Sequence, residues 1–228
     1  MQAHPGGWFV YSKQKNVPEG MKGNAGDIWT WTAIDADTKL APSWLVGSRD
    51  GEAARVFMAD LASRLRGRVH LTSDGHKPHL QAVEGAFGAD VDCAMLVKLY
   101  GGVKGEGPAG SAQRKYSPAE CVGIHKAVIT EAPDEAHVST SFAERANLTL
   151  RMHMRWFTRL TNAFAKKVEN HEAAVALHFM HYNFVRQHRT LGGISPAMAA
   201  GVTDKLWEME DVAQLVQDWE HNQRGDSN

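Results

Sequence analysis

The sequence predicts an α/β protein in which a mixed β-sheet is flanked by helices and followed by a helical C-terminal extension. Three observations favour this class. Three strand-like segments separated by turns come first, strand-like and helix-like segments then alternate as far as residue 100, and helical periodicity dominates after residue 140. Strands followed by strand–helix alternation are typical of a mixed sheet with helices on both faces.

The first three strands are expected at residues 8–11, 28–34 and 40–47, where aromatic and β-branched residues gather. Between the second and the third, Asp35 and Asp37 belong to a segment with the composition of a hairpin turn. Together these segments predict an antiparallel meander.

The alternating part is expected to consist of a helix at residues 50–66, a strand at 69–72, a helix at 78–87 and a strand at 93–100. In the first of these helices, apolar residues recur at spacings of three and four, which gives the helix one buried face. These residues are Ala54, Phe57, Met58, Leu61 and Leu65.

The second half begins with an insertion at about residues 101–138, which contains a glycine-rich loop and a possible strand at 122–129. Helices are expected at residues 141–170, 172–187 and 207–223. We therefore divide the chain into a main domain at residues 1–170 and a helical extension at residues 171–228.

Composition places the chain among ordinary globular proteins, with 228 residues, 43% hydrophobic residues, 22% charged residues and a net charge of −1. No apolar run is long enough to cross a membrane, and the N-terminus has no signal-peptide pattern. Cys93 and Cys121 form no metal-binding pair or disulfide framework. We expect a cytoplasmic protein with no membrane-spanning segment.

Two acidic residues stand where acids could hold a divalent cation beside a phosphodiester. Asp74 ends a strand-like run, and Glu144 lies in the first turn of a basic helix. For each acid there is also an alternative to metal binding, namely a purely structural role. Asp74 precedes a glycine, as in a turn, and Glu144 forms with Ser141 the S-x-x-E pattern of a capping box.

Basic residues follow Glu144 with few acids among them, as a surface that contacts a phosphate backbone would have. The alternative is a solvated charged face. Lys77, close to Asp74, is a further candidate for DNA contact, and Lys98 ends an apolar strand near the same sheet edge. The candidates on the helical segment are Arg145, Arg151, Arg155, Arg159, Lys166 and Lys167.

Three histidines, His178, His181 and His188, fall within or just after the second predicted helix of this half. Their spacing would allow a metal site, but no cysteine or paired carboxylate completes a ligand set nearby. We expect them to pack against the neighbouring aromatic residues.

Taken together, residues 29–39 (WTWTAIDADTK), 72–78 (TSDGHKP), 142–148 (FAERANL), 157–164 (FTRLTNAF) and 181–184 (HYNF) resemble the DDE transposases of bacterial insertion sequences, of the insertion-sequence-one type. The resemblance extends over about residues 2–202. It implies a ribonuclease H-like mixed sheet whose acidic triad binds two Mg²⁺ (or Mn²⁺) ions. It also implies DNA as the partner, a homo-oligomer, and cleavage and strand transfer at transposon ends.

By this resemblance Asp74 is the second acid of the triad and Glu144 the third. The first should lie on the first strand, but His4 stands in its place and Pro5 follows. The zinc-ribbon and helix-turn-helix regions that usually precede the domain are absent from this sequence. We expect impaired activity in a truncated or decayed copy. The alternatives are a non-catalytic DNA-binding or oligomerisation module and a ribonuclease H-like nuclease with other substrates.

Overall fold

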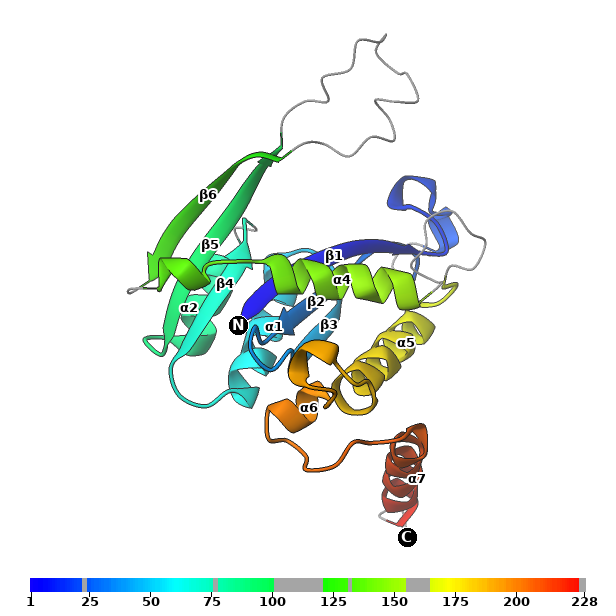
Figure 1. Ribbon diagram of the computed structural model, residues 1–228. Helices are drawn as coiled ribbons and strands as arrows, with labels where there is room; N and C mark the ends of the chain where they lie inside the picture. Colours follow the sequence, from blue (N-terminus) through cyan, green and yellow to red (C-terminus); the bar gives the residue numbers. More distant parts are fainter. Residues whose placement is uncertain (22–23, 76–77, 101–120, 131–132, 155–164, 226–228) are drawn as a thin grey trace, which may run out of the picture.

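The computed structural model describes residues 1–21, 24–75, 78–100, 121–130, 133–154 and 165–225 (Figure 1). They form a six-stranded mixed sheet with helices on both faces, as predicted. The strands are β1 (Gln2–Val10), β2 (Gly26–Ile34), β3 (Ser43–Gly47), β4 (Val69–Asp74), β5 (Val91–Tyr100) and β6 (Cys121–Thr130). The longer helices are α1 (Gly51–Arg64), α2 (Pro78–Phe87), α4 (Ser141–His153), α5 (Val168–Met180) and α7 (Met209–Gly225).

The strands lie in the order β3-β2-β1-β4-β5-β6. The pairs β1–β2 and β2–β3 are antiparallel, which confirms the predicted meander, and β4 is parallel to both β1 and β5. The added edge strand β6 is antiparallel to β5 and confirms the strand predicted within the insertion. In the β1–β4 ladder Ala3 lies opposite Ser73, and this register brings the next residues, His4 and Asp74, to the same part of the sheet.

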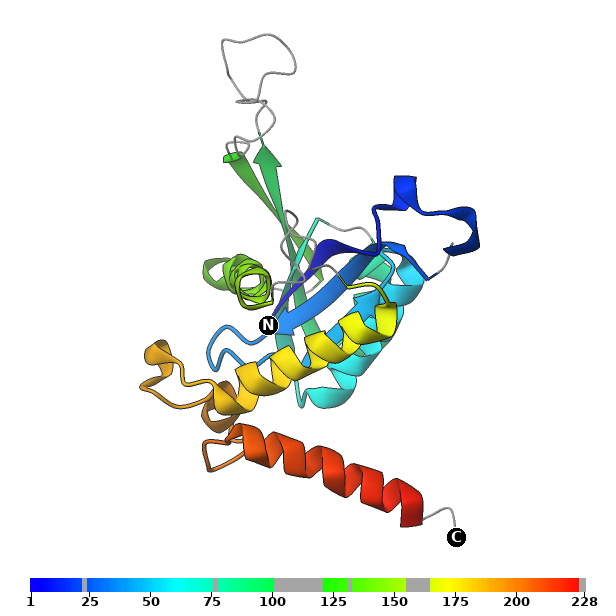
Figure 2. The same ribbon diagram turned by 90° about the vertical axis from the view of Figure 1, so that its right-hand side faces the viewer.

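Each face of the sheet has its own hydrophobic core. On one face α1 and α2 bury Phe57, Leu61 and Val83 against Trp31 and Leu71 of the strands. On the other face α4 and α5 cover a second cluster. Figure 2 shows α4 and α1 on opposite sides of the sheet. The second cluster includes Trp8, Val10, Ile34, Ala143, Leu150, Val175 and Phe179.

Strand β1 is longer than predicted, because it begins at Gln2 rather than at Trp8. The sequence around Pro5 has low strand propensity, and proline cannot donate a ladder hydrogen bond. The structure accommodates Pro5 where β1 leaves β4, since that ladder stops at Ala3. Beyond it β1 continues to pair with β2 as far as Val10.

The prediction of one helix over residues 141–170 is wrong, because α4 ends at His153 and Met154 is extended. A straight helix of that length would be about 45 Å long, at 1.5 Å per residue. Ending α4 early lets a second helix, α5, bring Val175 and Phe179 back to the same core. Residues of both α4 and α5 therefore contribute to the core on this face.

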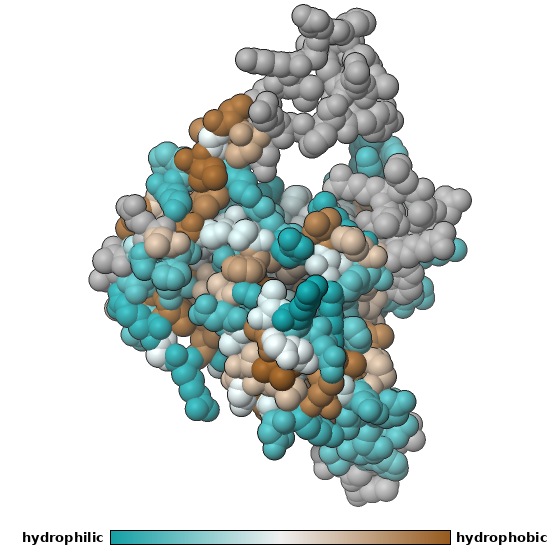
Figure 3. Space-filling view, viewed as in Figure 1, coloured by the Kyte–Doolittle hydropathy of each residue, from teal (hydrophilic) through white to brown (hydrophobic). Residues whose placement is uncertain are grey.

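After α5 the chain forms a π-helical turn at His181–Val185, a short helix α6 (Pro196–Ala199), and then α7, which lies away from the sheet (Figure 2). Apolar side chains are exposed on the β5–β6 pair, at the upper left of Figure 3, where Leu99, Val122 and Ile124 are each more than half exposed. Among the described residues, no helix has the length and apolar character needed to cross a membrane.

Candidate active site

His4 and Asp74 form the floor of the candidate site. The parallel register of β1 and β4 places them side by side, with His4 Nε2 4.0 Å from Asp74 Oδ2. A second imidazole, that of the fully buried His79 on α2, also lies near this carboxylate, with its Nδ1 3.3 Å from Asp74 Oδ1. Asp74 therefore lies between two imidazoles.

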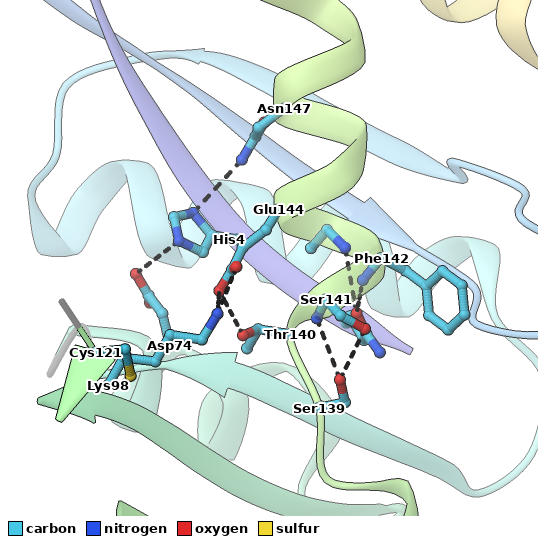
Figure 4. A network of polar contacts seen from close by, with 12 residues as sticks. His4, Asp74, Lys98, Cys121, Ser139, Thr140, Ser141, Phe142, Glu144 and Asn147 are labelled. Carbon is cyan, nitrogen blue, oxygen red and sulfur yellow. Dashed lines mark hydrogen bonds and ion pairs between the residues drawn. The ribbon is translucent and has the colours of Figure 1, made fainter. Parts of the chain in front are cut away.

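Glu144 approaches from the first turn of α4 and forms an ion pair with Lys98 of β5 (Figure 4). The Lys98 ammonium donates hydrogen bonds to Glu144 Oε1 at 2.6 Å and to Oε2 at 2.5 Å. Thr140 Oγ1 donates a further bond to Oε1 at 2.8 Å. Partial burial alone would raise the pKa of the Glu144 carboxyl, but the hydrogen bonds from Lys98 and Thr140 and the charges of Lys98 and His4 outweigh it. The net shift of this pKa is downward, and Glu144 is held as a carboxylate.

The capping-box interpretation of Ser141 and Glu144 is wrong. The residue that precedes the helix is Thr140, and the Glu144 carboxylate turns toward Lys98 rather than back to the backbone. Two N–H groups in the first turn of α4 find their acceptor on β1 instead, because Phe142 N and Ala143 N donate to Gln2 Oε1 at 2.8 and 3.2 Å. This contact fixes the start of α4, and so Glu144, relative to β1.

The other ring nitrogen of His4, Nδ1, faces a backbone carbonyl group and the side chain of Asn147. This nitrogen lies 2.8 Å from the carbonyl oxygen of Pro5 and 3.5 Å from Asn147 Nδ2 on α4. Figure 4 shows His4, Asp74, Lys98 and Glu144 converging between the sheet and α4. The cluster combines two carboxylates with one ammonium and one imidazole.

This residue set does not fit the two-Mg²⁺ centre that the resemblance implies. Mg²⁺ prefers oxygen ligands and near-ideal octahedral geometry. Here an imidazole stands in the place of the first carboxylate, and both oxygens of Glu144 are bound by Lys98. Within the described parts of the chain, no three histidine, cysteine or acidic side chains come together as a metal-binding group.

Three of the predicted DNA-binding residues, Lys77, Arg155 and Arg159, lie outside the described residues. The Arg151 guanidinium stacks over the Trp8 ring at 4.5 Å.

Lys166 and Lys167 are exposed in the segment before α5, and Arg145 lines a hollow beside α4. The four described basic residues thus come from α4 and from the segment that precedes α5.

The other two sequence expectations for this region are confirmed. His178 is buried and its ring contacts those of Phe179 and Tyr182, as expected for packing. Asp35 accepts hydrogen bonds from Thr38 N and Oγ1, which confirms the hairpin turn.

Four residues of the site were not identified from the sequence as partners of the acids: Gln2, His79, Thr140 and Asn147. Gln2, His79 and Asn147 act through contacts with residues on other elements, for which a single sequence carries no local signal. Thr140 precedes Glu144 by one helical turn, a spacing that could have indicated their contact.

The chain matches no protein-family model, and a search among curated proteins finds no significant match.

Proposed function

We propose that this chain is the catalytic-fold domain of a DDE-type transposase of the insertion-sequence class. In this proposal its DNA cleavage and strand transfer are impaired because His4 stands where the first acid belongs. One observation carries the proposal: the β1–β4 register sets His4 beside Asp74, at the point which Glu144 approaches from α4. This register supports the placement of His4 at the first-acid position, which the resemblance implies.

The strand arrangement also supports this assignment. An antiparallel β1–β2–β3 meander, followed by β4 and β5 parallel to β1, is the arrangement of a ribonuclease H-like sheet, to which β6 is an addition. The helix that carries the last acid of such a site would be α4, which covers the sheet face next to His4. Fold alone does not determine function, so the proposal depends on the positions of the side chains.

The chemistry of the site explains why turnover should be impaired. Phosphoryl transfer depends on positive charge placed beside the phosphate. An imidazole supplies no negative charge to attract Mg²⁺, and Lys98 neutralises Glu144. The partners in this proposal are DNA and further copies of the chain, in the cytoplasm.

A strand-transfer assay on double-stranded DNA with Mg²⁺ or Mn²⁺ tests the proposal. We expect little activity from the wild type and a clear gain from His4→Asp, which Glu144→Gln should abolish. The matched control is His4→Asn, which changes the same side chain without restoring a carboxylate. Strong wild-type activity that Glu144→Gln removes and His4→Asp does not raise would contradict the assigned impairment.

The second candidate is a non-catalytic DNA-binding module, which the Lys98–Glu144 ion pair favours because it stabilises the site without a divalent cation. This candidate predicts salt-dependent DNA binding with no turnover by wild type, His4→Asp or a His4→Asp/Lys98→Met double variant. Turnover by the double variant would exclude a purely structural role for the cluster.

A further inference from the structure

A basic hollow of about 410 Å³ lies beside α4, and Glu144 is not among the residues that line it. Three parts of the chain form it: the turn between β2 and β3, the first half of α4, and the segment that follows α5. In Figure 1 these are the bend at the end of β2, α4, and the loop next to α6. Its lining includes cationic and hydroxyl-bearing side chains, namely Lys39, Ser141, Arg145, Thr149, Arg186 and Thr190.

The hollow carries three positive charges, and no carboxylate is among the described residues that line it. Lys39, Arg145 and Arg186 form no ion pair with any acid in the described parts of the chain. Asp35 and Asp37, the acids nearest to Lys39 in the sequence, line a different hollow beside the N-terminus, and Glu144, next to Arg145, pairs with Lys98. The charges are therefore not neutralised within the fold.

Two of these cations are held in place. Lys39 donates to the carbonyl oxygen of Ala36, and its ammonium lies 3.6 Å from the centre of the Phe142 ring. The Arg186 guanidinium lies 3.4 and 3.5 Å from the ring nitrogens of His153, which is not an anionic partner. These two side chains are therefore already ordered, so ligand binding would cost less side-chain conformational entropy.

His188 also lines the hollow. Its pKa is lowered to about 4, first by burial and then by the positive charges of Arg186 and Lys39. Its Nε2 is buried and has no hydrogen-bond partner among the described residues. Hydroxyl groups of Ser141, Thr149 and Thr190 complete a lining that donates hydrogen bonds and carries positive charge.

We propose that this hollow binds a phosphate group of a DNA backbone. Guanidinium and ammonium groups with hydroxyl donors are the usual ligands of a phosphate, and arginine can bind it with two parallel hydrogen bonds. The hollow and the candidate site share α4, since Arg145 faces the hollow and the adjacent Glu144 faces Lys98. A strand lying across the start of α4 would place one phosphate in the hollow and present another to the candidate site.

The identification of DNA as the source of the phosphate rests on the proposed function. The claim that the hollow binds a phosphate group rests on its positive charges, which would also attract a free phosphate. The two sources are separated by using inorganic phosphate alone and a fluorescein-labelled DNA duplex of fixed sequence as separate probes.

The experiment measures duplex binding by fluorescence anisotropy over a range of salt concentrations. The test variant is Arg145→Gln/Arg186→Gln. The matched control is Lys15→Gln/Arg66→Gln, which removes two exposed charges far from the hollow in sequence. Losing two phosphate contacts should reduce the magnitude of the log–log salt slope by about 2 and weaken binding by about tenfold at low salt. The control should leave the slope close to that of the wild type.

Equal affinity and slope in the test and control variants would overturn the proposal, as would binding of inorganic phosphate with no binding of the duplex. If the double variant fails to fold, the single variant Arg145→Gln tests the proposal, because Arg145 is exposed and its replacement should not disturb the fold. This single variant should reduce the slope by about 1.

The test is independent of catalysis. If the salt slope of Arg145→Gln/Arg186→Gln is reduced and His4→Asp is inactive, phosphate binding in the hollow is supported and the proposed function is contradicted. If His4→Asp is active and the salt slope is unchanged, the proposed function is supported and phosphate binding in the hollow is contradicted.

Discussion

Lys98 binds both carboxylate oxygens of Glu144, although the two residues lie 46 positions apart in the sequence. The lysine comes from β5 and the glutamate from α4, so the ion pair joins the sheet to the helix that covers it. It also means that any cation approaching Glu144 must compete with an ammonium that the fold supplies.

The first prediction concerns this competition. In Lys98→Met, we expect the pKa of Glu144 to rise, because burial is then opposed only by Thr140 and the more distant charge of His4. A depressed carboxyl pKa stabilises the folded protein above the unfolded pKa, and this stabilisation is lost as the pH falls through the folded value. The variant should therefore show a smaller acid-induced loss of stability from this group.

Carbon-13 NMR of the glutamate carboxyls during a pH titration measures the change in Lys98→Met. The matched control is Lys126→Met on the adjacent strand β6, opposite Leu96, which removes the same charge without touching Glu144. A Glu144 resonance that titrates at the same pH in Lys98→Met and in the control would contradict the assigned role of the ion pair.

The second prediction concerns Gln2, whose side chain is buried and caps α4 from β1. Replacing it by alanine leaves the N–H groups of Phe142 and Ala143 without their acceptor. We expect Gln2→Ala to lower the free energy of unfolding by about 1 to 2 kcal/mol, as for the loss of a helix cap. Urea denaturation followed by circular dichroism measures the loss.

Gln81→Ala on the exposed side of α2 is the control for this variant, and it should change stability by less than about 0.5 kcal/mol. If the two variants are equally stable, Gln2 does not anchor the helix.

The fold class could be predicted from the sequence because its signals are local. The meander, the alternation that follows it and the strand of the insertion were all found from propensity and periodicity, and each is present. The first half of β1 could not be found in this way, because Pro5, Gly6 and Gly7 have low strand propensity and are held by pairing with β2.

The candidate site was only partly predictable for the same reason. Asp74 and Glu144 were identified as acids, and His4 was placed at the first position by resemblance. The contacts of these residues come from long-range packing, such as the Gln2 cap on α4, 140 positions away. The end of α4 after His153 was also missed, since no proline or glycine marks it and the core on that face decides it.

The third prediction concerns the pH dependence of stability. The pKa values of His171 and His178 are lowered to about 4, in both cases mainly by burial. Between the ordinary histidine pKa of about 6.5 and a pH of about 4, the unfolded chain therefore binds protons that the folded chain does not. Stability should fall as the pH is lowered through this window, by up to about 1.4 kcal/mol per pH unit for each histidine.

Chemical denaturation at several pH values between 7 and 4 measures this slope. His171→Gln should make it shallower, whereas replacement of the exposed His221 by glutamine should not. A slope that is the same in both variants would mean that His171 titrates normally in the folded protein.

The last prediction concerns the charge at position 4. In His4→Asp a second carboxylate would stand next to Asp74, where His4 Nε2 now lies 4.0 Å from Asp74 Oδ2. Two like charges at that distance repel by about 1 to 4 kcal/mol, depending on the local dielectric constant. Without divalent ions the variant should therefore melt at a lower temperature than the wild type.

Because a cation that binds only the folded state stabilises it, Mg²⁺ should raise the melting temperature of His4→Asp in a concentration-dependent way. The neutral control His4→Asn should respond to Mg²⁺ no more than the wild type does. If differential scanning calorimetry finds the same Mg²⁺ response in both variants, position 4 does not belong to a cation site.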